Sequence, residues 1–404
     1  MDGALRTILR PPPPPSAPAL RGPTPPSLAF AHGRTYVNDS ALLKHHLDHG
    51  ATLASGTPPF VLFFDDVPRE YRAARESCAM VDQTDRGCVE LRGADAAVFL
   101  HRLTANEVRK LAPGQGLRNL LLSSKGKVLF DFDLSVESDR ILLSTSPGRA
   151  AALLTALDTY LFSEKVSFAN LTESHAPIAL CGPRADEVVE SVCAVRPPQE
   201  MNAHAMAQFD GAPVKLTRTP VAGSLGLRVD AGPERAERLW SALQAAGAAP
   251  IGRVAYDSLR VEAGWAEPEV DIDDSVYPQE ARLERAFSLD KGCYIGQEVV
   301  AKIDTYGGLN KRLVALALSH DDPIPRGARL WREDGGEWRD LGVSTSWAYS
   351  FELDRGLMLA YVKRRHQAVG TRFRVGSVES ALAEATVVAL PIRPDALPPT
   401  GEFE

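Results

Sequence analysis

The sequence lacks the features of several large protein classes. No apolar run approaches the roughly 18 residues that a membrane-spanning helix needs. The net charge of −7 argues against sequence-independent nucleic-acid binding, because such binding requires a basic surface. We therefore expect neither a membrane partner nor a direct nucleic-acid partner.

Cysteine is also scarce and widely spaced. The chain of 404 residues has five cysteines, which form neither a C-x-x-C pair nor a zinc-like spacing. We expect no metal site, and no iron–sulfur cluster held by this chain alone, since such clusters usually take four cysteine ligands. An odd, scattered set suggests reduced thiols in a cytosol-like compartment. The five are Cys78, Cys88, Cys181, Cys193 and Cys293.

Proline is concentrated near the start of the chain. Residues 1–35 include the run Pro11 to Pro15 and several further prolines, a composition that cannot bury a core. Arginines at 6, 10, 21 and 34 against the single acid Asp2 also permit an organelle transit peptide, although the prolines oppose its amphipathic helix. We predict a disordered leader and a cytoplasmic location, with organelle targeting as the alternative.

One stretch, Lys291 to Glu298, has the composition of a site. Gly292 and Gly296 bracket Cys293, so the backbone can turn tightly there. Lys291 stands two residues before the thiol, and a cation that close favours the thiolate. The alternative is that Cys293 is a small buried hydrophobe at a turn.

The middle of the chain has an internal repeat. An apolar strand leads into a proline and then an amphipathic helix at Ser146-Pro147, where the hydroxyl would cap a helix that starts with the proline. The same pattern recurs 86 positions later from Pro233. We infer two related α+β units in tandem, unless two proline-capped helices look alike by convergence.

After Lys311-Arg312 the pattern changes to short strands. Four apolar runs are separated by turn residues, and the only helical pattern among them lies near Glu379 to Glu384. This texture predicts a separate small β barrel or sandwich. The runs are 313–318, 341–344, 357–362 and 371–375.

The octet at 291–298 resembles the K-G-C-[FY]-x-G-Q-E signature of the YgfZ branch of the YgfZ/GcvT folate-binding family. That family also contains the T-protein (aminomethyltransferase) of the glycine cleavage system. T-proteins have a related F-I-G-[KR]-E segment at this place and lack the cysteine, so Cys293 points to the YgfZ branch. Further similarity covers about 60–392, and its motifs are L-T-x-N-D-V at 103–108, P-G-Q at 113–115, D-x-L-R-x-E-x-G at 257–264 and P-x-E-A at 278–281.

The resemblance implies an α+β fold in which two related α/β units form a folate-binding, T-protein-like body, followed by a C-terminal β barrel. We place the body at 36–305, with units at about 60–170 and 171–305. The barrel follows at 306–392 and a tail at 393–404.

The chain also departs from the T-protein pattern. T-proteins have a glutamate that can match the pterin edge of folate with two parallel hydrogen bonds. Ser224 stands at that position here, and Val221 replaces an aromatic residue. The acid pair of G-x-V-x-D-D-L is reduced to Asp131, the one candidate to place a reacting amine. A strand residue that faces solvent is an equally good interpretation of Asp131.

The resemblance therefore implies a folate-binding accessory factor that supports iron–sulfur cluster assembly or repair in client proteins, including enzymes that modify tRNA. Cys293 would be the working thiolate and Lys291 would tune it, with Asp131 as a further catalytic candidate. If 257–264 is a strand, Arg260 and Glu262 share a face and would hold tetrahydrofolate, or simply pair with each other. The alternatives are a tetrahydrofolate-dependent aminomethyltransferase or demethylase, and a scaffold that has lost its ligand. The expected folate-binding set is completed by Lys291, Gly292, Tyr294, Gly296 and Gln297.

Overall fold

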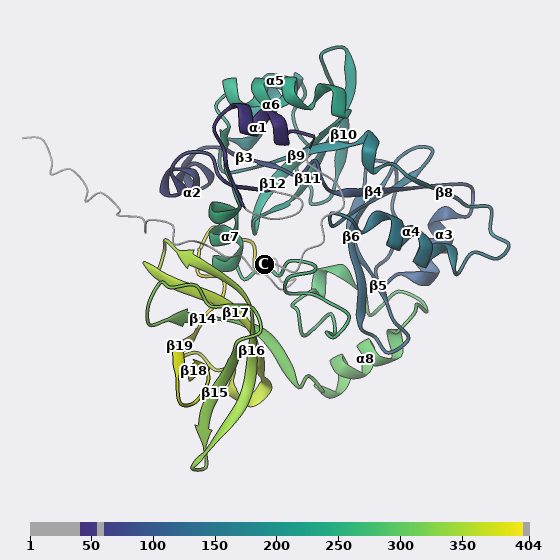
Figure 1. Cartoon of the computed structure of the whole chain (residues 1–404). Coiled ribbons are helices and arrows are strands. Elements are labelled where there is room, and N and C mark those ends of the chain that lie inside the picture. The colour runs from purple at the N-terminus through teal and green to yellow at the C-terminus, as the bar shows by residue number, and fades with distance from the viewer. Residues whose placement is uncertain (1–40, 55–59, 399–404) are drawn as a thin grey trace, which may run out of the picture.

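The computed structural model describes residues 41–54 and 60–398, in which two β sheets with flanking helices and one β barrel are arranged around a common centre (Figure 1). The predicted leader at 1–35 lies outside the described residues. No helix in the described part of the chain has the length and apolarity to cross a bilayer.

The first sheet is antiparallel, with the strand order β5-β6-β7-β4-β8. Two helices cover one of its faces, because Phe99, Leu100 and Leu153 pack on Leu91 and Phe132 of the strands. This cluster is the core of the first unit. Its elements are β4 (Gly87–Arg92), α3 (Ala96–Leu103), β5 (Gly116–Leu122), β6 (Val128–Val136), β7 (Ile141–Thr145), α4 (Ala150–Asp158) and β8 (Ser167–Asn170).

The second sheet has the order β10-β11-β12-β9-β3-β13 and is antiparallel except between β3 and β13. Val189, Leu239 and Trp240 of its helices pack against Ile178 and Leu227. This is the core of the second unit. The elements are α1 (Leu43–Asp48), β3 (Ala79–Asp82), β9 (Ala176–Cys181), α5 (Ala185–Cys193), β10 (His204–Phe209), β11 (Ala212–Val221), β12 (Ser224–Ala231), η2 (Pro233–Arg235), α6 (Ala236–Ala245) and β13 (Ala249–Pro250).

The two units have the same topology, which confirms the predicted internal repeat. In each, a strand and a helix are followed by three strands and a second helix, and β5-β6-β7-β4 has the same order as β10-β11-β12-β9. The second helices begin at Ala150 and Ala236, a displacement of 86 residues. The predicted helix start at Ser146-Pro147 is wrong, because α4 begins at Ala150 without a side-chain cap.

The segment before the first unit does not belong to it. Residues from 60 were predicted to join the first unit, but β3 hydrogen-bonds β9 and β13 of the second sheet. Periodicity indicates which face of a strand is buried but not which strand it pairs with. This segment also contains β1 (Thr52–Leu53), β2 (Val61–Phe63) and α2 (Val67–Glu76).

Helix α7 (Arg253–Glu262) connects the body to the barrel and lies between the second sheet and β16 (Figure 1). The strand considered for 257–264 is therefore wrong. The turn η3 (Glu284–Ala286) and the helix α8 (Gln297–Tyr306) complete the connection.

The C-terminal part is a closed six-stranded barrel, as predicted. Leu316, Met358 and Phe373 are among the side chains that fill its core. The helical pattern near 379–384 is strand β19 instead. The strands are β14 (Lys311–Leu318), β15 (Arg329–Asp334), β16 (Glu337–Ser350), β17 (Arg355–Lys363), β18 (Arg372–Gly376) and β19 (Ala381–Val388), with η4 (Arg364–His366) after β17.

The segment after the barrel packs back onto the body, so residues 393–398 are not a free tail. Arg393 is 0% exposed and donates to the carbonyls of Ala222 and Leu259. The Leu397 amide donates to the Gly223 carbonyl. These contacts fix the segment against the β11–β12 turn.

Candidate functional site

A central cavity of about 160 Å³ lies where the two sheets meet the segment after α7. Its walls come from β6, from β11 and β12, and from residues 256–286. Six arginines and three carboxylates line it, so its lining is cationic overall. These residues are Arg86, Arg118, Arg228, Arg260, Arg282, Arg285, Asp131, Asp133 and Glu267.

Asp131 faces this cavity from β6. Its carboxylate accepts from Arg118 Nε at 2.8 Å on one oxygen and from Nη2 on the other. The residue is only 8% exposed, so the solvent-facing interpretation is wrong. The two-point ion pair fixes the carboxylate and occupies both of its oxygens. A reacting amine would have to displace Arg118 to use it.

Asp133 is a cavity residue that the sequence interpretation missed. It lies two residues after Asp131 on the same strand, and alternation places both side chains on one face. Arg228 lies 3.0 Å from its carboxylate and Arg86 lies 3.5 Å from it. Burial raises the pKa of Asp133, but these two arginines outweigh burial and lower it overall.

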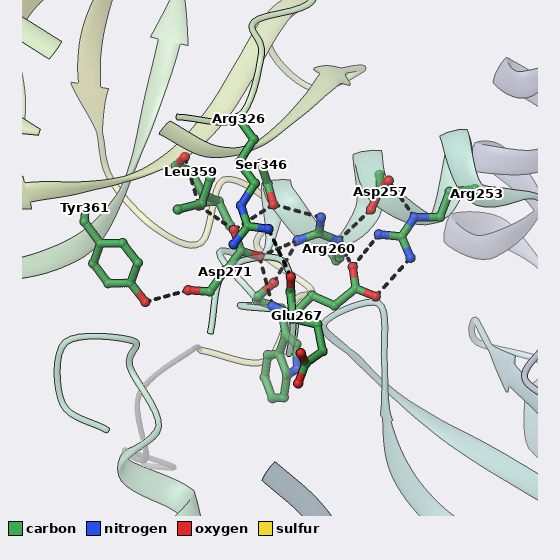
Figure 2. Close-up of polar contacts among 12 residues, drawn as sticks. Arg253, Asp257, Arg260, Glu267, Asp271, Arg326, Ser346, Leu359 and Tyr361 are labelled. Atoms are coloured by element: carbon green, nitrogen blue, oxygen red, sulfur yellow. Dashed lines mark hydrogen bonds and ion pairs between the residues drawn. The ribbon is translucent and has the colours of Figure 1, made fainter. Parts of the chain in front are cut away.

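Arg260 lines the cavity but is held in a buried polar network (Figure 2). Its Nε donates to Asp257 at 2.6 Å, and its Nη1 lies 2.9 Å from Asp271. Its Nη2 donates to Ser346 of the barrel at 2.9 Å, while Glu267 lies 3.2 Å from Nε. Arg260 therefore holds the connection and the barrel together rather than facing a ligand freely.

Glu262 is not a cavity residue. Because α7 is a helix, residues two apart point in different directions. The Glu262 carboxylate accepts from Tyr71 at 2.7 Å and from Ser350 at 2.8 Å, with the Arg393 Nε at 3.7 Å. Arg260 and Glu262 therefore do not share a ligand-binding face. The direct ion pair between them, which was also considered from the sequence, is absent from the described residues.

Arg282 is one of the five cavity arginines that sequence reasoning did not identify. Its Nε donates to the Leu313 carbonyl at 2.7 Å, and no carboxylate of the described residues lies within ion-pair distance of it. Burial and the nearby Arg312 lower the pKa of Arg282 to about 10. Its φ of 60° is uncommon for a residue with a Cβ, and such strain is concentrated at functional sites. A half-buried cation that forms no ion pair with a carboxylate of the described residues is suited to an anionic ligand.

Aromatic side chains provide the apolar part of the cavity. Tyr256, Trp265 and Phe132 all line it. The guanidinium carbons of Arg118 and Arg285 each lie 6.0 Å from the Trp265 ring centroid. Planar rings of this kind can stack on a flat heterocycle.

Lys291 does not lie free beside the thiol. Its ammonium donates to the carbonyls of His101 and Thr104 and, at 3.1 Å, to that of Asn106. His101 is in the last turn of α3 and the other two residues follow its end, where helix carbonyls lack intrahelical partners. Burial lowers the pKa of Lys291 to about 8. Lys291 thus anchors the octet, and its predicted tuning of Cys293 stays a prediction.

Cys293 is exposed and does not line the central cavity. The buried-hydrophobe alternative is therefore wrong for Cys293. Cys293 is on the surface of the segment between α7 and α8, and the hydrogen bonds of Lys291 anchor that segment to the first unit. The other octet residues kept for folate (Gly292, Tyr294, Gly296 and Gln297) are likewise outside the cavity lining.

The two octet glycines differ in importance. Gly296 has a φ of 82° and precedes α8, and a Cβ there would lie 2.6 Å from the Ser123 carbonyl oxygen. The predicted turn therefore depends on Gly296. A Cβ at Gly292 would meet nothing within 4 Å, so the glycine is not required there.

Tyr294 and Gln297 stabilise the octet. Tyr294 is 7% exposed and packs in the core between body and barrel, where burial raises its pKa to about 12. The Gln297 amide donates to the Lys291 carbonyl at 3.4 Å.

The positions that replace the T-protein residues are also outside the cavity lining. Val221 is buried in the core beside α7. The Ser224 hydroxyl lies 3.1 Å from Arg393 Nη2, which belongs to the segment after the barrel. That segment therefore contacts the position at which the resemblance places the folate glutamate.

A repeat of two α+β units, a barrel and a cavity at their junction together define the T-protein architecture. The chain belongs to the T-protein family, since residues 50–291 match the model of the GCVT N-terminal domain and residues 311–392 match that of the glycine cleavage T-protein C-terminal barrel domain.

Individual relatives agree with this assignment. The chain is 27% identical over 369 residues to an aminomethyltransferase of Chlorobium limicola, covering 88% of this chain and 99% of the relative. It is 28% identical over 315 residues to a chloroplastic protein of Arabidopsis thaliana that carries only the general name of a transferase, covering 78% and 72% of the two chains.

A solved structure shows the same fold. The glycine cleavage system aminomethyltransferase T from Bartonella henselae superposes with a TM-score of 0.78 over 88% of this chain and 98% of the other, at 22% identity. The fold class predicted from the sequence is thereby confirmed.

Proposed function

We propose that this protein is a folate-binding accessory factor of the YgfZ type, which supports iron–sulfur cluster assembly or repair in client enzymes, including those that modify tRNA. In this proposal it binds tetrahydrofolate in the central cavity and uses Cys293 at its surface. One observation carries the proposal. Every carboxylate that lines the cavity is ion-paired with an arginine, whereas Arg282 has no carboxylate partner among the described residues.

The charged and aromatic residues of the cavity suit the chemical groups of tetrahydrofolate. Arg282 and Arg285 would hold the carboxylates of its glutamyl tail, since guanidinium binds carboxylate with two parallel hydrogen bonds. Trp265 and Tyr256 would stack on its ring system. When bound, the cofactor carries one-carbon units on its ring nitrogens. An acceptor for the donor groups of the pterin edge would have to come from one of the paired acids, such as Asp133.

The same lining does not support amine chemistry. A general base must present a free carboxylate to the proton that it removes. Asp131 is held at both oxygens by Arg118, and Ser224 supplies no acid and contacts the segment after the barrel. In our proposal the cavity therefore binds folate without transferring an aminomethyl group.

Cys293 is the residue that would contact a client. It is exposed, so its sulfur can reach another protein, and the anchored Lys291 and Gly296 hold its segment in one conformation. In cells that lack the protein, the Cys293→Ser variant should fail to restore the activity of iron–sulfur enzymes. Cys193→Ser, at a buried cysteine, serves as the matched control and should restore it. Full restoration by Cys293→Ser would refute this role and would favour the scaffold hypothesis.

A second candidate is a tetrahydrofolate-dependent aminomethyltransferase or demethylase. It is favoured by the full-length similarity to the Chlorobium limicola aminomethyltransferase. The purified protein would be incubated with tetrahydrofolate and candidate amine donors. Turnover that disappears in Asp131→Asn would establish this activity in place of the first proposal.

The location remains a separate proposal. We propose a cytoplasmic protein, although the chloroplastic name of the Arabidopsis thaliana relative favours organelle targeting by the leader. Fractionation of cells that express the full chain decides this, since a targeted leader would place the protein in the organelle fraction.

A further inference from the structure

A second group of reactive side chains lies at the junction of the two sheets, beside the central cavity but outside it. Cys88 is in β4 of the first sheet and Asp230 is in β12 of the second. His175 directly precedes β9. All three line a small cavity of about 20 Å³.

The three side chains line one cavity, and two of them are directly paired. His175 Nδ1 lies 2.7 Å from an Asp230 carboxylate oxygen. Cys88 lines the same small cavity as this imidazole, and its proximity contributes to the raised pKa of His175. A nucleophile next to a base, with a third group that orients the base, is the arrangement that activates weak nucleophiles in enzymes.

The surrounding charges favour an imidazolium. Burial lowers the pKa of His175, but the hydrogen bond to Asp230 and the proximity of Cys88 outweigh burial and raise the pKa to about 10. Lys215 also faces the cavity and lies 3.3 Å from Glu137, and Arg86 and Arg228 separate the cavity from the central one. The cavity that Cys88 lines is therefore surrounded by cationic side chains.

The other buried cysteines lack such partners. Burial raises the pKa of Cys78 and of Cys181 to about 12, and that of Cys193 to about 11. None of these three lines the small cavity. They are therefore internal controls for the reactivity of Cys88.

We propose that Cys88, His175 and Asp230 form a nucleophilic thiol site whose reactant is a small peroxide. The cavity has room for little more than one water-sized molecule, which excludes glutathione or a protein thiol. The proposal does not rest on folate binding or on Cys293.

The reaction is a two-electron oxidation of sulfur. The Cys88 thiolate attacks one oxygen of hydrogen peroxide, an S–O bond forms and the O–O bond breaks. The leaving hydroxide takes the proton of the His175 imidazolium and becomes water. Cys88 is then a sulfenic acid, which cellular thiols can reduce.

The direct test treats the reduced full-length protein with hydrogen peroxide at neutral pH. Dimedone traps sulfenic acid, and peptide mass spectrometry reports each cysteine separately. We expect Cys88 to be trapped at least tenfold faster than Cys181 and Cys193, with exposed Cys293 as the accessibility reference. Equal rates for Cys88 and the other buried cysteines would overturn the proposal.

Two variants test the partners. His175→Gln and Asp230→Asn should move the reaction of Cys88 to higher pH, because the cation that stabilises the thiolate is lost or weakened. The control is His204→Gln, at a buried histidine of β10 whose Nδ1 has no hydrogen-bond partner. An unchanged pH profile in correctly folded His175→Gln protein would contradict the assignment. If that variant does not fold, the trapping rates of the different cysteines in the wild-type protein still test the proposal.

Discussion

Arg260 Nη1 and Asp271 Oδ2 lie 2.9 Å apart, and both side chains are almost completely buried. Asp271 also accepts from the hydroxyls of Thr345 and Ser346 in β16 (Figure 2). The pair therefore joins α7 to the barrel through charged hydrogen bonds. Arginines and carboxylates stabilise this junction of α7 and the barrel, and the same residue types line the central cavity.

Removal of Arg260 should destabilise the protein strongly. Arg260→Ala leaves the buried carboxylates of Asp257 and Asp271 without a main partner, and breaking a buried ion pair costs about 3–5 kcal/mol. Chemical denaturation measures this as a lower midpoint. Arg372→Ala, at an exposed position of β18, is the control and should change little. A loss below about 1 kcal/mol would contradict the structural role.

Lys291 should be required for stability but not for the reactivity of Cys293. Lys291→Met leaves three carbonyl acceptors near the end of α3 without their donor, at a cost of about 2–3 kcal/mol. The alkylation rate of Cys293 in the folded variant should remain unchanged. Exposed Lys125→Met is the matched control. Slower alkylation of Cys293 in Lys291→Met, but not in Lys125→Met, would instead show that Lys291 activates the thiol.

The two glycines of the octet should respond oppositely to alanine. Gly296→Ala places a Cβ against the Ser123 carbonyl at a φ of 82°, and left-handed geometry alone costs about 1–2 kcal/mol. Gly292→Ala meets open space and should be neutral. Thermal unfolding of the two variants provides the comparison, and an equal loss in both would show that the turn is different from the one described.

The His175–Asp230 pair should make stability depend on pH. The folded-state pKa of His175 is about 10, well above the 6.5 of an unperturbed histidine. A raised pKa means that the folded state binds the proton more tightly, so the stabilisation is complete below about pH 6.5 and is lost as the pH rises through about 10. The difference in unfolding free energy between wild type and His175→Gln should decrease across that window. A difference that is constant with pH would exclude an imidazolium.

The fold could be predicted largely from the sequence because its signals are local. The repeated helices marked the two units, and turn residues marked the barrel strands. Sheet partners are set by long-range pairing, so the placement of β3 beside β9 could not be obtained this way. A strand at 257–264 was considered because it would place Arg260 and Glu262 on one face, yet tertiary packing buries both on a helix.

The site was predicted less completely. Asp131 and Arg260 were identified and do line the cavity, while Asp133 could have been found from the two-residue period. Arg282 and the Cys88–His175–Asp230 group could not, since their members come together only when separate elements pack. The contact between Ser224 and the segment at Arg393 was equally invisible, because the end of the chain resembles an ordinary tail.

The most direct test of the folate proposal is a calorimetric titration of the reduced protein with tetrahydrofolate. Arg282→Ala is the informative variant, because Arg282 lines the cavity without an ion-pair partner among the described residues, whereas Arg260 supports the fold. We expect saturable one-to-one binding that Arg282→Ala weakens about tenfold or more, as the loss of a charged hydrogen bond implies. Arg372→Ala should bind like wild type. No binding at millimolar tetrahydrofolate, where only sites weaker than about −4 kcal/mol escape detection, would contradict the proposal.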